Sequence, residues 1–132
     1  MYYHFTKTMS KILWIGGIFV KSKNPETLKA WYKDYLWIES GQMAAIFKWD
    51  TQATNVPSWF SIWSVFAKDS DYFEPSQKEF MINFVVDNLE DLTADLTNRG
   101  VEILSQMDEP SGKFIHIMDP EGTKIELWEP AN

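Results

Sequence analysis

Two side chains near the end of the sequence, His116 and Glu126, have the chemistry to act together. They fall in two predicted strands, residues 113–118 and 123–128, which are joined by turn residues at 119–122. Counting back from the turn puts the imidazole almost opposite the carboxylate, where side chains of paired strands approach each other. In an apolar cavity this pair could act as a general acid and base, or bind a metal weakly if another ligand joined it. The simpler interpretation is that His116 only forms a hydrogen bond with Glu126.

Alternation along the predicted strands indicates which side chains share a face with this pair. In the strand predicted at 80–86, one face is uniformly apolar and suits contact with a helix, and the other face is mixed. The last two strands also place aromatic residues on the side of the imidazole and the carboxylate. The ligand-binding candidates are Phe47, Trp49, Trp63, Met81, Asn83, Phe114 and Trp128. The alternative is that the rings fill the space and leave no cavity.

The elements that carry these residues form two similar halves. Each half begins with a strand, at 12–21 or 80–86, and continues with a helix capped by Asn24 or Asn88. Further strands are predicted at 43–49, 58–67, 101–104, 113–118 and 123–128. Neither half alone has enough core, so we predict one α+β domain over residues 1–132. Its predicted parts are module one at about 11–68, a linker at about 69–78 and module two at about 79–130.

The composition limits the class of protein. Aromatic residues make up 16% of the chain, with 7 tryptophans, so the core or a binding cavity is rich in rings. Three of them, Trp31, Tyr32 and Tyr35, share one face of the first helix, which is typical of core or interface packing. The chain has no cysteine, which excludes disulfides and thiolate metal sites.

Charge and hydropathy indicate the surroundings of the protein. The net charge of −7 disfavours nucleic acid as a partner. No apolar run approaches the ~20 residues of a membrane span, so no membrane partner is expected. Residues 1–11 lack the apolar stretch of a secretory signal, so a cytoplasmic location is expected. The chain could start at Met1 or at Met9, and His4 near this end is expected to have no specific role.

Five motifs resemble a known superfamily. They are Ile15-Gly-Gly-Ile-Phe-Val, Trp31-Tyr-Lys-Asp-Tyr-Leu, Met81-Ile-Asn-Phe-Val-Val-Asp-Asn-Leu, Arg99-Gly-Val-Glu-Ile and Asp119-Pro-Glu-Gly-Thr-Lys-Ile-Glu-Leu-Trp-Glu. Together they cover almost the whole chain and resemble the vicinal oxygen chelate superfamily of glyoxalase I, bleomycin-resistance proteins and extradiol dioxygenases. The resemblance implies two βαβββ modules whose sheets curl into an open barrel around the active site.

The resemblance also implies where a metal would bind. Metal-dependent members place one ligand on the first strand and one on the last strand of each module. Here the first-strand positions are Gly17 and Met81, and residues 59–67 contain no His, Asp or Glu. Only Glu126 retains a ligand, and a divalent ion needs three or four. We therefore expect no metal or other cofactor, with a divalent metal ion as the alternative.

These observations lead to three hypotheses about function. The first is a small-molecule-binding protein with a degenerate metal site, in which an aromatic cavity around Glu126 takes a partly aromatic or cationic ligand. The second is a lyase or isomerase similar to glyoxalase, with Glu126 and His116 as the catalytic residues. The third is a structural dimer module with a filled barrel. The resemblance and the exposed strands and rings lead us to expect a homodimer.

Overall fold

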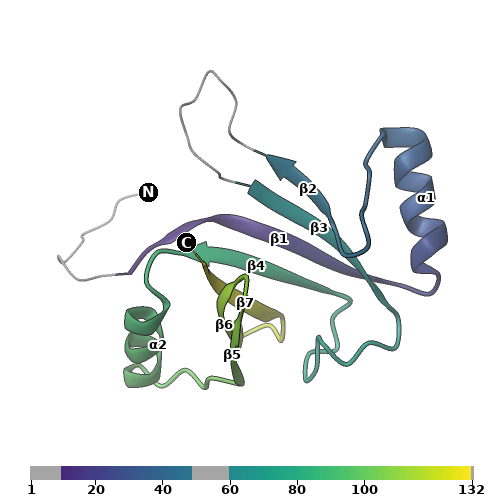
Figure 1. Ribbon diagram of the computed structural model, residues 1–132. Coiled ribbons are helices and arrows are strands. Elements are labelled where there is room, and N and C mark those ends of the chain that lie inside the picture. Colours follow the sequence, from purple (N-terminus) through teal and green to yellow (C-terminus); the bar gives the residue numbers. More distant parts are fainter. Residues whose placement is uncertain (1–9, 49–59, 132) are drawn as a thin grey trace.

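The described part of the chain forms one mixed sheet and two helices, which lie at opposite ends of the sheet (Figure 1). The computed structural model describes residues 10–48 and 60–131. In chain order the elements are β1 (Ile12–Ser22), α1 (Pro25–Leu36), β2 (Ala45–Lys48), β3 (Phe60–Ala67), β4 (Phe80–Val86), α2 (Leu89–Asn98), β5 (Ser105–Glu109), β6 (Gly112–Met118) and β7 (Lys124–Pro130). The predicted α+β class with an open, curled mixed sheet is confirmed.

Strands β1 and β4 join the two halves at the middle of the sheet. The strand order is β2-β3-β1-β4-β7-β6-β5. The central pair is antiparallel, and each of its strands pairs on the outer side with a parallel strand of its own half, β3 or β7. The halves therefore repeat one arrangement around the central pair. In the described part of the chain, the first half contributes three strands and the second half four.

Both helices begin at the predicted asparagine caps. The side chain of Asn24 accepts a hydrogen bond from the N–H of Thr27, and that of Asn88 accepts one from the N–H of Asp91. After α2 the chain turns at Gly100, whose φ of 88° favours glycine. In the described residues, no helix is both long enough and apolar enough to cross a membrane.

Helix α2 covers the face that the alternation predicted. The buried residues of this core are Val86, Leu89, Ile115 and Leu127, and Phe84, Leu92, Leu96, Ile103, Ile117 and Ile125 pack against them. The predicted face assignment for the strands of the second half is therefore confirmed. The predicted site lies on the other face of these strands.

The strand predicted at 101–104 is wrong, because β5 begins only at Ser105. The N–H of Val101 donates to the C=O of Leu96 in α2 at 2.9 Å. Ile103 packs against the core beneath that helix. The apolar residues that resembled a strand therefore bring the chain from α2 back onto the sheet.

Helix α1 packs more loosely than α2. None of its residues is buried. The ring of Tyr32 contacts Trp63 of β3, with centroids 4.2 Å apart, whereas Trp31 and Tyr35 are 49% and 67% exposed. Of the three rings predicted to form a packing face, only that of Tyr32 therefore packs against the sheet.

Candidate functional site

The site is a row of polar side chains across four neighbouring strands. Strand register pairs Asn83 of β4 with Glu126 of β7, Glu126 with His116 of β6, and His116 with Ser105 of β5. Paired residues project from the same face of a sheet, and this face is opposite to the one that α2 covers. The predicted pairing of His116 with Glu126 is thus part of a longer row.

Glu126 lies at the centre of this row and is only 2% exposed. Its Oε1 accepts a hydrogen bond from Asn83 Nδ2 at 2.7 Å. Its Oε2 lies 2.7 Å from His116 Nε2 and also accepts a hydrogen bond from the hydroxyl of Tyr72. Burying a carboxylate is costly unless it is hydrogen-bonded, and three partners meet that requirement here.

The carboxylate determines which nitrogen of His116 carries the proton. An ionised carboxylate only accepts hydrogen bonds, so Nε2 of His116 must donate to Glu126. In the neutral imidazole Nδ1 is then an acceptor, and the hydroxyl of Ser105, 3.0 Å away, donates to it. Ser105, His116 and Glu126 therefore form a directed chain of hydrogen bonds.

Asn83 is oriented by the same carboxylate. Because its Nδ2 donates to Glu126, its Oδ1 points away and has no hydrogen-bond partner. It is the one buried side-chain nitrogen or oxygen without a hydrogen-bond partner in the described residues. A Cβ on Gly16 would lie 2.3 Å from this oxygen, so only glycine leaves room for the amide. An irregularity of pairing between Ile15 and Gly17 of β1 lies opposite Asn83.

Tyr72 comes from the segment between β3 and β4, which the sequence suggested was only a linker. The neighbouring Phe73 is fully buried against Phe19 and Met81. The ammonium of Lys124 donates to the C=O groups of Tyr72 and Glu74, at 2.6 and 2.7 Å. These contacts hold the segment over the concave face.

Burial affects the ionisation of both side chains at this contact. It raises the pKa of the Tyr72 phenol, and the charge and hydrogen bond of Glu126 raise it further. Burial also lowers the pKa of the Lys124 ammonium, against the attraction of Glu126, Asp71 and Glu74. Tyr72 therefore stays a proton donor to the carboxylate in neutral and moderately alkaline solution.

An aromatic strip lies beside the polar row. Phe114 stacks on Trp128 with centroids 5.7 Å apart and an interplanar angle of 2°. Phe60 meets the same indole edge-on at 5.7 Å. Register pairs Phe114 and Val85 with Trp128, two residues along each strand from the row of Glu126. The predicted neighbourhood of Phe114 and Trp128 is therefore present, and Phe60 is an addition to it.

The remaining candidates divide between the two faces. Met81 is fully buried on the concave face, where it packs with Phe19 and Phe73. The predicted orientation of Trp63 and Phe47 is wrong. Trp63 packs on α1, and Phe47 shares its face because it pairs with Ser61, two residues before Trp63. Apolar residues occupy both faces of β3, so alternation alone could not assign them. Trp49 lies outside the described residues.

The side chains of the row do not fit the metal site that the resemblance implies. Nowhere in residues 10–48 and 60–131 do three His, Cys, Asp or Glu side chains come close enough to hold a metal ion. In the register of Glu126, β1 supplies Gly17 and β3 supplies Ile62, neither of which can bind a metal. The two groups that could, Glu126 and His116, are hydrogen-bonded to each other.

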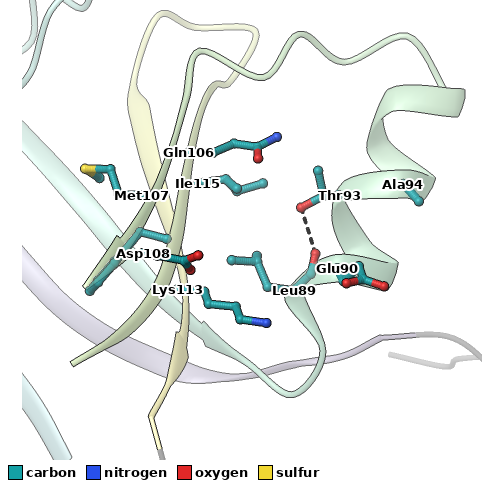
Figure 2. Close-up of a pocket in the computed structure, with 10 residues that line it drawn as sticks. Leu89, Glu90, Thr93, Ala94, Gln106, Met107, Asp108, Lys113 and Ile115 are labelled. Atoms are coloured by element: carbon teal, nitrogen blue, oxygen red, sulfur yellow. Dashed lines mark hydrogen bonds between the residues drawn. The ribbon is translucent and has the colours of Figure 1, made fainter. Parts of the chain in front are cut away.

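A separate groove of about 560 Å³ lies between α2 and strands β5 and β6 (Figure 2). Its polar residues are Glu90, Thr93, Gln106, Asp108 and Lys113. In Figure 2 Gln106, Lys113 and Ile115 point toward α2 and Met107 points away, so the groove lies on the helix-covered side of the sheet. It is not connected with the polar row, which projects from the other face.

No family model matches the chain, and no curated protein matches it. Solved structures do match the chain. Methylmalonyl-CoA epimerase from Mycobacterium tuberculosis aligns with a TM-score of 0.67 and 16% identity, over 98% of this chain and 95% of that chain. The Streptomyces coelicolor epimerase in complex with 2-nitronate-propionyl-CoA gives 0.67 and 15%, over 92% and 100%. The chain has the vicinal oxygen chelate fold.

The same fold is matched by a structure described as NAD-dependent benzaldehyde dehydrogenase from Legionella pneumophila. Its TM-score is 0.58 at 16% identity, over 87% of this chain and 98% of that chain. Neighbours with different named activities share the vicinal oxygen chelate fold, so the fold does not determine the reaction. The function must be argued from the side chains of the site.

Sequence reasoning missed two members of the row's hydrogen-bond network. Tyr72 lies in a segment without periodicity. The adjacent aromatic residues Tyr72 and Phe73, in otherwise polar surroundings, were the one sequence feature that could have indicated a role for this segment. Ser105 falls directly after the strand predicted at 101–104. A later start for that strand would have paired Ser105 with His116, as the register does.

Proposed function

We propose that the chain binds a small molecule on its concave face, with a hydrogen-bond donor of the ligand at Asn83 Oδ1. The observation that carries this proposal is that Oδ1 is buried and has no partner among the described residues. Buried acceptors in native proteins nearly always have a donor, and leaving one without a donor is costly. A ligand N–H or O–H that reached this buried oxygen would satisfy it.

The surroundings of Asn83 define the rest of this ligand. On one side Tyr72 and Phe73 cover the sheet. On the other side lies the strip of Phe60, Phe114 and Trp128, two residues or roughly 7 Å along the strands. Such a strip suits a flat, apolar body. We therefore expect a flat ligand with one donor group at its end.

Polyanionic ligands fit this site poorly. The Streptomyces coelicolor epimerase structure contains a coenzyme A derivative. Here the net charge is −7, and the ammonium of Lys124, the one buried lysine among the described residues, donates to backbone carbonyls. Among the described residues of the concave face, no buried cation is then available to bind phosphates. We expect propionyl-CoA to bind more weakly than a neutral aromatic donor.

Indole and 1-benzothiophene provide the test, because they are similar in shape and only indole has an N–H. Each is titrated into the ¹⁵N-labelled full chain, and the side-chain signals of Asn83 and Trp128 are followed by NMR. We expect indole to bind roughly three- to tenfold more tightly, as one hydrogen bond implies. In Asn83→Leu this preference should disappear, whereas Asn88→Leu, a change at a helix cap remote from the row, should keep it.

The other two hypotheses predict different results. If no aromatic probe shifts these signals, the binding proposal fails, and the result favours the structural module with a filled barrel. A glyoxalase-like lyase or isomerase would need Glu126 as a free base, but both carboxylate oxygens already accept hydrogen bonds. That hypothesis would require turnover that falls by orders of magnitude in Glu126→Gln. The predicted homodimer stays a prediction, which sedimentation velocity would decide.

A further inference from the structure

The side chains of Ser105, His116 and Glu126 have the connectivity of an activated serine. The hydroxyl of Ser105 lies 3.0 Å from His116 Nδ1, and Nε2 of the same ring lies 2.7 Å from Glu126 Oε2. The acid holds the ring in the tautomer whose free nitrogen accepts the serine proton. We propose that Ser105 is a nucleophilic serine, with His116 as its general base, that reacts with activated esters and organophosphonates.

The surroundings of His116 stabilise the positive charge that this reaction would place on its ring. When Ser105 loses its proton, His116 becomes an imidazolium between the serine and Glu126. A carboxylate at 2.7 Å stabilises that cation. The carboxylate is itself fixed by Asn83 Nδ2 and by the hydroxyl of Tyr72. The ring is therefore already oriented for proton transfer before any reagent arrives.

Access also distinguishes Ser105. It begins β5, the outermost strand at this end of the sheet, and is partly exposed, whereas His116 and Glu126 are 3% and 2% exposed. A reagent can thus reach the hydroxyl from the sheet edge while the base stays shielded. Two buried serines among the described residues are bonded differently. The hydroxyls of Ser64 and Ser76 donate to backbone carbonyls, which cannot take up the proton.

The reaction with p-nitrophenyl acetate balances without any cofactor. A bond forms between Ser105 Oγ and the acetyl carbon, and p-nitrophenolate leaves with the electron pair of the broken C–O bond. The serine proton moves to His116 Nδ1. His116 then releases this proton to solvent. Water attacks the acetyl-serine and gives one proton through His116 to Oγ, and the acetyl group leaves as acetic acid. The step does not depend on the ligand proposed at Asn83, so the two proposals can fail separately.

An alkyl fluorophosphonate tests the proposal on the full chain. It forms a bond from phosphorus to the serine oxygen and releases fluoride, and peptide mass spectrometry locates the added group. We expect Ser105 to be modified about 100-fold faster than any other serine of the chain, which is the low end of general-base activation. This comparison within the unaltered protein does not require any variant to fold.

Variants identify the source of the reactivity. Ser105→Ala should remove the label, and His116→Gln should slow it about 100-fold. Ser64→Ala should label at the rate of the unaltered chain. The proposal is overturned if Ser105 labels no faster than the other serines, or if His116→Gln labels as fast as the unaltered protein.

Discussion

The hydrogen bond between Tyr72 and Glu126 can be tested by removing a single oxygen atom. Tyr72→Phe keeps the ring that stacks on Phe66, with centroids 5.4 Å apart, and removes only the hydroxyl. Hydrogen bonds to charged groups are worth about 1.5–3 kcal/mol. Glu126 keeps two other partners, Asn83 and His116. We therefore expect the free energy of unfolding to fall by about 2 kcal/mol.

Urea unfolding at neutral pH measures this change, with the midpoint shifted and the slope unaltered. Tyr35→Phe is the matched control, because it removes the same atom from a side chain that is 67% exposed. Its effect should stay within about 0.5 kcal/mol. A double-mutant cycle with Glu126→Gln should show coupling of at least about 0.5 kcal/mol. If Tyr72→Phe costs no more than Tyr35→Phe, the assigned contact with the carboxylate is wrong.

Three further predictions concern the same face. Because the folded state raises the pKa of Tyr72, its contribution is complete below the ordinary tyrosine pKa of about 10 and is lost as pH rises above it. The stability difference between the unaltered chain and Tyr72→Phe should thus shrink above this pH, which urea unfolding checks. Gly16→Ala should destabilise by about 1–3 kcal/mol, since its Cβ would lie 2.3 Å from Asn83 Oδ1, whereas Gly41→Ala has 3.8 Å of space and serves as the control. Elemental analysis should find far less than one metal ion per chain, and a stoichiometric ion lost in Glu126→Ala would contradict this.

Much of the fold could be predicted because local signals and the tertiary structure agree. Asn24 and Asn88 both cap helices at the predicted places. In the second half, strands with one uniformly apolar face bury that face beneath α2. The failure at residues 101–104 had a tertiary cause. Ile103 packs under the helix, and nothing in a run of four residues separates that environment from a strand.

The site could be predicted only where strand pairing determines it. The pairing of His116 with Glu126 follows from the turn between their strands, and register confirms it. Orientation in the first half could not be read from β3, where Trp63 and Ile62 are apolar residues on opposite faces. The role of Tyr72 could not be predicted, for another reason. Its contact with Glu126 joins residues 54 positions apart, and no periodic pattern encodes it.

The burial of Glu126 explains why these parts belong together. A carboxylate that is 2% exposed has lost nearly all its water, a penalty of several kcal/mol that a bound metal ion could offset. Its neighbours in register, Gly17 and Ile62, cannot help to hold such an ion. Hydrogen-bond donors stabilise the carboxylate where a metal ion would. They come from three separate elements, β4, β6 and the segment between β3 and β4. The carboxylate therefore links that segment to the row, because Tyr72, Asn83 and His116 all bond to it. Removing Glu126 leaves all the donors unpaired, so Glu126→Ala should destabilise the chain more than the loss of any single donor.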